Sequence, residues 1–165
     1  MPKLSLPNLL TAANLVCGIS AIIASFTTDW VRACFFILAS VFFDTLDGWM
    51  ARRMGQETRF GAFFDSFADF ISFGLAPVFA FRALGSPLKT WVILGLASYV
   101  LASAFRLIRF HAQSKPAGHK NFQGLPTTAS AFIFVISLWL APSAWSPWIL
   151  SFLMISRMPF VRPFA

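Results

Sequence analysis

Six apolar stretches, separated by short polar segments, constrain what this chain can fold into more than any other feature of its sequence. Their lengths lie near the roughly twenty residues that an α-helix needs to cross the hydrocarbon core of a bilayer. Only 12% of the 165 residues are charged, whereas charged residues make up about a quarter of an average soluble domain. The sequence therefore predicts an all-α, polytopic membrane bundle that forms a single domain over residues 1–165. The expected spans are Leu9–Phe26, Trp30–Met50, Phe60–Phe81, Leu88–Leu107, Leu125–Leu140 and Pro147–Val161; the last is short and contains Arg157.

The distribution of basic residues predicts how this bundle is oriented. Cytoplasmic loops of membrane proteins carry an excess of Lys and Arg, and a cytoplasmic N-terminus places ten of the thirteen basic residues on that side. The net charge is +7, and the basic residues flank apolar segments. We therefore expect anionic lipid and phosphorylated substrates as partners, and no nucleic acid. The ten residues are Lys3, Arg52, Arg53, Arg59, Arg106, Arg109, Lys115, Lys120, Arg157 and Arg162, against Arg32, Arg82 and Lys89 on the other side.

Four of the six acidic residues fall within one window of otherwise apolar sequence, as Asp44, Asp47, Asp65 and Asp69. In helices, the first two are three residues apart and share one face, and the last two are four apart and share another. The polar segment 53–59 between them predicts a tight turn that sets the two helices antiparallel. The four carboxylates are therefore expected to converge at the cytoplasmic side of the membrane.

Clustered carboxylates in an apolar setting need a positive charge among them, because like charges in a low dielectric repel strongly. A ligand set of oxygens without His or Cys favours Mg²⁺ or Mn²⁺ over Zn²⁺, and such ions near carboxylates usually serve phosphate chemistry. The alternative is charge pairing with Arg52, Arg53 or Arg59. Another is a small ion or solute transporter, which would spread its acids through the membrane.

Other polar residues are expected at the same depth as the acids. Asn8 is predicted to cap the first helix, with Thr11 one turn later. Arg106 and Arg109, three residues apart at the end of the fourth stretch, are typical of arginines that reach lipid headgroups, but they also suit a phosphate or carboxylate clamp. Pro77 predicts a kink towards the outer end of the third stretch.

The acidic window resembles the signature of the CDP-alcohol phosphatidyltransferases at each of its fixed positions. These run Asp44-x-x-Asp47-Gly48-x-x-Ala51-Arg52, then eight residues, then Gly61-x-x-x-Asp65-x-x-x-Asp69. The resemblance implies a core of six membrane helices, an active site at the cytoplasmic surface, a CDP-activated lipid donor, Mg²⁺ or Mn²⁺, and a homodimer. It also implies a bacterial or archaeal cytoplasmic membrane as the location.

The resemblance also implies a role for each matched residue. Asp44, Asp47 and Asp65 would bind metal, and Asp69 would be the general base and a possible ligand of a second ion. The cytidine diphosphate site would be lined by Gly48, Ala51 and Arg52, with Gly61 letting the facing helix come near and with Asn8 and Thr11 facing the phosphates.

Three further motifs resemble the phosphatidylserine synthase branch of the family: Pro7–Thr11 with Asn14 and Cys17-Gly18, then Asp65–Pro77, then Arg106–Phe110 with Phe122–Pro126. They predict transfer of a phosphatidyl group from CDP-diacylglycerol to L-serine, with Arg106 or Arg109 recognising the serine carboxylate or the lipid phosphate. Glycerol 3-phosphate, inositol phosphate or choline is the alternative acceptor. The chain departs from the pattern at its ends, where we expect a short or absent amphipathic helix at the start and a shortened C-terminus.

Overall fold

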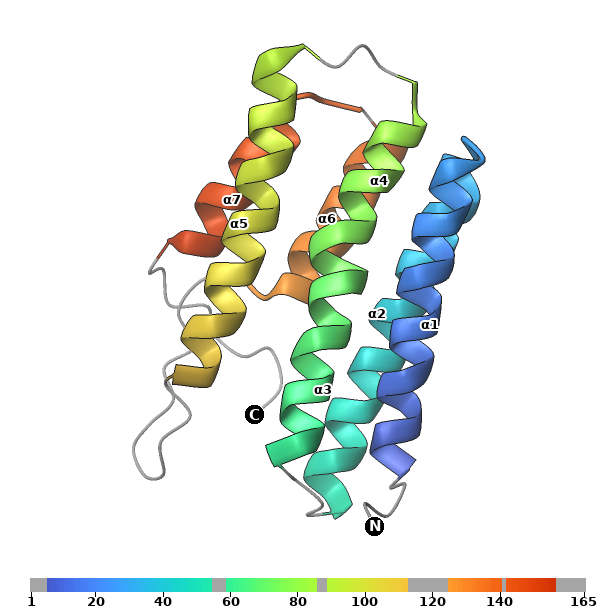
Figure 1. Ribbon diagram of the computed structural model, residues 1–165, viewed down its shortest axis with the longest axis vertical. Helices are drawn as coiled ribbons and strands as arrows, with labels where there is room; N and C mark the ends of the chain where they lie inside the picture. The colour runs from blue at the N-terminus through green and yellow to red at the C-terminus, as the bar shows by residue number, and fades with distance from the viewer. Residues whose placement is uncertain (1–5, 55–58, 86–88, 113–124, 141, 157–165) are drawn as a thin grey trace.

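The computed structural model describes residues 6–54, 59–85, 89–112, 125–140 and 142–156, and in these ranges every regular element is a helix (Figure 1). The third predicted span is one column built from α3, a π-helical turn and α4 (Figure 1). The elements are α1 (Leu6–Phe26), α2 (Trp30–Met54), α3 (Arg59–Asp69), the π-helix (Phe70–Leu75), α4 (Ala76–Ala83), α5 (Thr90–Ala112), α6 (Thr127–Leu140) and α7 (Ser146–Ile155).

Four of these helical segments are long and apolar enough to cross a bilayer, and together they make the chain an integral membrane protein. They agree closely with the first four predicted spans. Helices α6 and α7 are apolar but only 14 and 10 residues long, below the usual length of a membrane-spanning helix. The four spanning segments are Leu6–Phe26, Trp30–Met50, Gly61–Ala83 and Thr90–Arg109.

The first helix begins earlier than its sequence suggests. Helix α1 already includes Leu6 and Pro7, and proline fits the first turn of a helix because the N–H it lacks has no partner there. The prediction that Asn8 caps this helix is therefore wrong, since Asn8 lies within it. Its side chain is half-buried on the first turn.

The helices that carry the acids are held together by close backbone approach. Gly18 of α1 packs directly on Ser72 of the π-helix, where a Cβ on the glycine would lie 2.2 Å from the Ser72 Oγ. The hydroxyls of Ser40 and Ser72 both donate to the backbone carbonyl of Asn14, at 3.0 and 3.1 Å. Helix α2 and the π-helix that continues α3 are thus fixed against α1 around one buried residue.

The irregular turn in the third column follows from its proline. Pro77 has no N–H, so the carbonyl of Phe73, four residues earlier, loses its normal helical partner. The chain forms a π-helix over Phe70–Leu75 immediately before α4, and the hydroxyl of Tyr99 on α5 donates to the Phe73 carbonyl at 3.0 Å. The kink at Pro77 stays a prediction, while the π-helix before it joins this column to α5 through the Tyr99 hydrogen bond.

Candidate metal centre and active site

Three aspartates converge at one point between α2 and α3. One carboxylate oxygen from each of Asp44, Asp47 and Asp65 lies within 4.8 Å of the other two. Asp47 is only 4% exposed, and the other two are half-buried. The helical spacing of Asp44 and Asp47 puts both on the side of α2 that faces α3, so the convergence expected from the sequence is present.

Asp69 lies one turn beyond Asp65 on the same column and borders this triad. The charges of Asp44 and Asp65 act directly on its carboxyl group. The amide nitrogen of Asn14 donates to Asp69 Oδ1 at 3.4 Å. Asp69 therefore belongs to the same site, although it is not one of the three carboxylates whose oxygens meet.

Neutral side chains from two other helices hold the triad. Thr11 of α1 donates its hydroxyl to Asp47 Oδ2 at 2.8 Å, and Thr128 of α6 donates to Asp44 Oδ2 at 3.0 Å. A donor of this kind fixes one carboxylate oxygen and leaves the other lone pairs for a ligand. Each of these bonds links α2 to a different helix, so the carboxylates are oriented by the fold.

The donor set fits a hard divalent ion. Carboxylate oxygens without His or Cys suit Mg²⁺ or Mn²⁺, and Asp65 Oδ1 is buried without a hydrogen-bond partner. A buried polar atom of this kind usually has a ligand, an ion or water to satisfy it. Asp44, Asp47 and Asp65 are therefore the residues that could hold the ion.

The structure gives little support to the alternative that the aspartates pair with nearby arginines. Arg53 is exposed and lies over the ring of Trp49, 5.0 Å from its centroid. The side chains of Arg52 and Arg59 lie outside the described residues.

Arg106 reaches the same region from α5. Its Nη1 donates to Thr127 Oγ1 of α6 at 3.1 Å, while its Nε is buried without a partner. The charge of Asp69 acts on this guanidinium group. Arg109 is half-buried one turn further along α5. The structure therefore places Arg106, one of the two predicted clamp residues, within electrostatic reach of Asp69.

The other predicted site residues lie on α1, α2 and α3. Gly48 on α2 and Gly61 on α3 are half-buried. Ala51 and Arg52 belong to α2, but their side chains lie outside the described residues. Thr11 is bonded to Asp47.

The sequence predicts no individual role for three residues that contact the site: Asn14, Thr127 and Thr128. Asn14 appears there only as part of a motif. The two threonines follow a Gly-Leu-Pro sequence at the start of a helix, where hydroxyl residues are common as caps. The signal that could have found them is a polar residue at the predicted depth of the acids on a helix other than α2 and α3.

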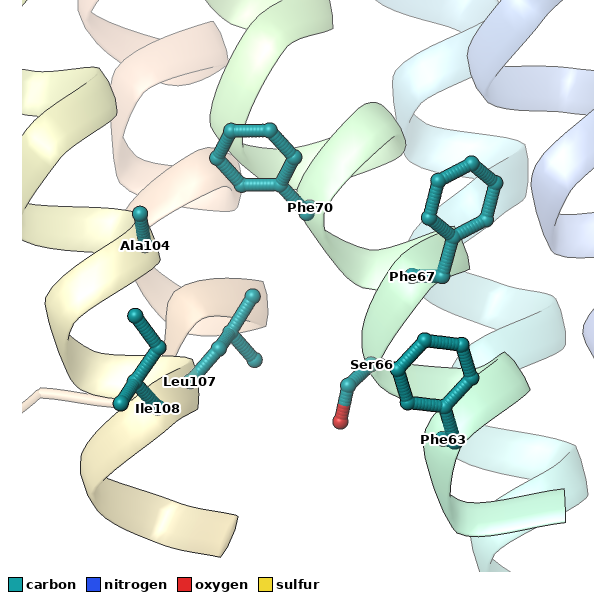
Figure 2. Close-up of a pocket in the computed structure, with 7 residues that line it drawn as sticks. All are labelled: Phe63, Ser66, Phe67, Phe70, Ala104, Leu107 and Ile108. Atoms are coloured by element: carbon teal, nitrogen blue, oxygen red, sulfur yellow. The ribbon is translucent and has the colours of Figure 1, made fainter. Parts of the chain in front are cut away.

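An apolar groove of about 420 Å³ lies on a different face of α3 from the acids (Figure 2). In Figure 2, side chains of α3 and the π-helix face side chains of α5 across it, and Ser66 has the one oxygen among the side chains drawn. Such a lining accepts hydrocarbon and excludes charged groups. A polar substrate must therefore reach the acids from another side. The lining residues are Phe63, Ser66, Phe67, Phe70, Ala104, Leu107 and Ile108.

Comparison with known proteins gives a consistent result. A family model described as CDP-alcohol phosphatidyltransferase matches residues 4–160. The CDP-diacylglycerol–serine O-phosphatidyltransferase of Helicobacter pylori is 34% identical over 140 residues, which cover 84% of this chain and 59% of that protein. The archaetidylserine synthase of Methanothermobacter thermautotrophicus is 37% identical over 130 residues, covering 78% of this chain and 55% of that protein.

A relative from Bacillus subtilis is matched over most of its length. This CDP-diacylglycerol–serine O-phosphatidyltransferase is 30% identical over 161 residues, which cover 94% of this chain and 89% of that protein. The chain spans less than two thirds of the length of the Helicobacter and Methanothermobacter proteins.

Proposed function

Because the chain belongs to the CDP-alcohol phosphatidyltransferase family, we propose that it transfers the phosphatidyl group of CDP-diacylglycerol to the hydroxyl of L-serine. The products are phosphatidylserine and CMP. Serine is favoured as the acceptor because two of the relatives above carry serine in their name and the third is an archaetidylserine synthase. The observation that carries the proposal is the convergence of Asp44, Asp47 and Asp65 beside Asp69.

Asp44, Asp47 and Asp65 would hold Mg²⁺ or Mn²⁺, with Asp69 as a possible ligand of a second ion. When bound, a divalent ion would neutralise the negative charge of the diphosphate on the donor and of the departing CMP. The protein's own contribution is to orient the carboxylates. Thr11 and Thr128 do this by each occupying one oxygen of an aspartate.

Asp69 is assigned as the general base. The serine hydroxyl attacks the phosphorus of the donor, the bond from phosphorus to the CMP oxygen breaks, and Asp69 takes the hydroxyl proton. Asn14 donates to Asp69 Oδ1 at 3.4 Å, which would orient the carboxyl group for this proton transfer. Asp69 interacts electrostatically with the triad and with Arg106, which supports its assignment beside the acceptor hydroxyl.

Arg106 is assigned to the serine carboxylate, with Arg109 beside it for the carboxylate or the lipid phosphate. The unpartnered Nε of Arg106 supports this assignment, because a guanidinium binds a carboxylate through two parallel N–H groups. Replacing Arg106 with Ala should raise the serine KM more than it weakens metal binding. Unchanged serine kinetics in variants of both arginines would remove the assignment.

The nucleotide of the donor is assigned to the residues that match the family signature. Gly48, with Ala51 and Arg52, would line the cytidine diphosphate, and Gly61 would let α3 approach it. Asn8 and Thr11 lie one turn apart on α1, at the level of the triad, which supports their assignment near the phosphates.

The surroundings of the enzyme are also part of the proposal. The distribution of Lys and Arg favours a cytoplasmic N-terminus and an active site that faces the cytoplasm. A bacterial or archaeal membrane is inferred from the family resemblance. The short helices α6 and α7 would complete six spans. A homodimer is inferred from the family resemblance, and chemical cross-linking of the protein in membranes would test it.

The rival functions make different demands. Glycerol 3-phosphate or inositol phosphate as acceptor would need a more basic pocket than one arginine pair. Choline carries no carboxylate, and so would leave Arg106 without a role in acceptor binding. A transporter would distribute its acids along a path through the membrane, whereas the triad oxygens lie within 4.8 Å of one another.

The test supplies purified protein with CDP-diacylglycerol, Mn²⁺ or Mg²⁺ and a panel of labelled alcohols, and follows label in extracted lipid together with CMP release. We expect serine to be incorporated, and Asp69→Asn to lower the rate by about 10²- to 10⁴-fold. Asp29→Asn is the matched control, because Asp29 lies away from the site, where its Oδ2 is 3.2 Å from the Nε of Arg32. Label in a different alcohol, or full activity of Asp69→Asn, would refute the proposal.

A further inference from the structure

The first turn of α6 carries two adjacent threonines that contact two different parts of the site. Thr127 accepts a hydrogen bond from Arg106 Nη1 at 3.1 Å. Thr128 donates to Asp44 Oδ2 at 3.0 Å. Successive residues of a helix point about 100° apart, so neighbours on one turn can face α5 and α2 separately.

The backbone that carries these threonines is anchored on three sides. The N–H of Leu125 donates to the Leu153 carbonyl of α7 at 3.3 Å, and the N–H of Ser130 donates to the Pro126 carbonyl at 2.9 Å. The Ser130 hydroxyl donates to the Thr127 carbonyl at 2.7 Å and lies 3.3 Å from the Tyr99 hydroxyl of α5. The two hydroxyls therefore stand on a fixed turn, which lets them set the positions of their partners.

The two contacts act on groups of opposite charge. Thr127 is only 2% exposed, and it satisfies one nitrogen of a guanidinium whose Nε has no partner. Thr128 is half-buried and satisfies one oxygen of a carboxylate in the triad. Losing either hydroxyl would remove a hydrogen bond from one defined charged group, and would leave the bond to the other group in place.

We propose that Thr127 and Thr128 are positioning residues with separate tasks: Thr127 orients Arg106 for the acceptor, and Thr128 orients Asp44 for the divalent ion. The inference rests on the proposed function, since the acceptor task presumes that Arg106 binds serine. It adds a role for α6, which contributes none of the predicted metal ligands.

The two tasks can be measured separately with isosteric variants. Thr128→Val should raise the dissociation constant for Mn²⁺ about 10-fold or more, measured by electron paramagnetic resonance of free Mn²⁺ on purified protein without substrates. Thr127→Val should leave Mn²⁺ binding unchanged but raise the serine KM about 10-fold or more, as expected for one lost hydrogen bond to a charged group. Thr127→Ser and Thr128→Ser keep the hydroxyls and should restore both values.

Each outcome decides between a divided role and plain structural support. If both Val variants change Mn²⁺ binding and serine KM alike, or if Thr128→Val binds Mn²⁺ as the wild type does, the inference is overturned. If the wild type binds Mn²⁺ and transfers no serine, the proposed function and the task of Thr127 fail. In that case Thr128→Val still decides the metal task. Circular dichroism and gel filtration in detergent establish that each variant is folded, and Thr127→Ala or Thr128→Ala, which also removes the hydroxyl, carries the test if the Val variant is not.

Discussion

The hydroxyl groups beside the aspartates bond across helices, whereas those elsewhere in the bundle bond mainly to their own helix. Thr11, Thr128 and Ser72 each donate to a residue on a different element. Ser25 and Ser137, by contrast, donate to backbone carbonyls four and three residues earlier in the same helix. The first pattern fixes the relative positions of helices, and the second only satisfies the hydroxyl.

The same contrast holds for unsatisfied polar atoms. Three buried side-chain atoms in the described part of the chain have no hydrogen-bond partner: Asn14 Oδ1, Asp65 Oδ1 and Arg106 Nε. All three belong to residues in or beside the acid cluster. Unpaired buried polar atoms are costly and uncommon in stable proteins. Their concentration at one place indicates a site whose remaining partners are ligands.

The largest effect on stability is expected at Gly18, where α1 meets the π-helix that follows Asp69. A Cβ there would lie 2.2 Å from Ser72 Oγ and 2.8 Å from its Cα, so Gly18→Ala should lower the free energy of unfolding by about 3 kcal/mol or more. Thermal unfolding in detergent measures this. Gly74→Ala is the milder control, because its Cβ meets only side-chain atoms, of Phe70 at 3.1 Å and of Ser103 at 3.3 Å. Equal stability of the two variants would show that this contact does not hold the acid-bearing helices.

The second prediction concerns the loss of stability that repulsion among the clustered carboxylates causes. In the presence of a chelator, Asp65→Asn should stabilise the protein by about 2 kcal/mol. This is less than the roughly 4 kcal/mol repulsion of two unit charges 4 Å apart at an effective dielectric constant of 20, because solvent relieves part of it. Asp29→Asn, which breaks an exposed pair with Arg32, should not stabilise. A loss of stability in Asp65→Asn would mean that the cluster is not strained without a cation.

A third, smaller effect is expected at the contact between the π-helix and α5. Tyr99→Phe removes the donor to the Phe73 carbonyl, a group that Pro77 has already deprived of its helical partner, and should cost about 1.5 kcal/mol. Chemical denaturation monitored by Trp fluorescence measures the change. Ser130→Ala, which removes only the longer 3.3 Å contact to Tyr99 and a bond within α6, should cost less. The reverse order would contradict the role given to this hydroxyl.

The smallest prediction compares the two kinds of hydroxyl directly. Ser72→Ala should cost about 1 kcal/mol, because it breaks a bond between elements, while Ser25→Ala should change stability by less than about 0.5 kcal/mol. Both residues are buried, so the variants differ mainly in where the bond leads. Paired thermal melts in the same detergent separate them. Equal costs would remove the contrast between the two regions.

Much of the fold follows from the sequence, because long apolar stretches in a membrane protein have few alternatives to helices. The first four spans were predicted closely. The start of α1 was not, because Asn8 resembles a cap while Pro7 fits inside a first turn equally well. The prediction of full-length spans at 125–140 and 147–161 was based on hydropathy, and α6 and α7 are shorter than an apolar run alone indicates.

The candidate site could be predicted only in part. Asp44 and Asp47 share a helix face by spacing alone, and one oxygen of Asp65 on α3 lies within 4.8 Å of theirs. The contacts of Thr128 with Asp44 and of Thr127 with Arg106 join residues 84 and 21 positions apart. No local pattern encodes these contacts, because they depend on how α6 packs in the bundle.

The most direct test of the central claim is the stabilisation of the protein by Mn²⁺, measured as the shift in thermal unfolding of wild type and Asp65→Asn in detergent without substrates. If the aspartates hold a divalent ion, Mn²⁺ at 100 times its dissociation constant should stabilise the wild type by about 2.7 kcal/mol. Asp65→Asn, although more stable in chelator, should gain little. An equal shift in both proteins, or none in the wild type, would contradict the claim that these carboxylates form a metal centre.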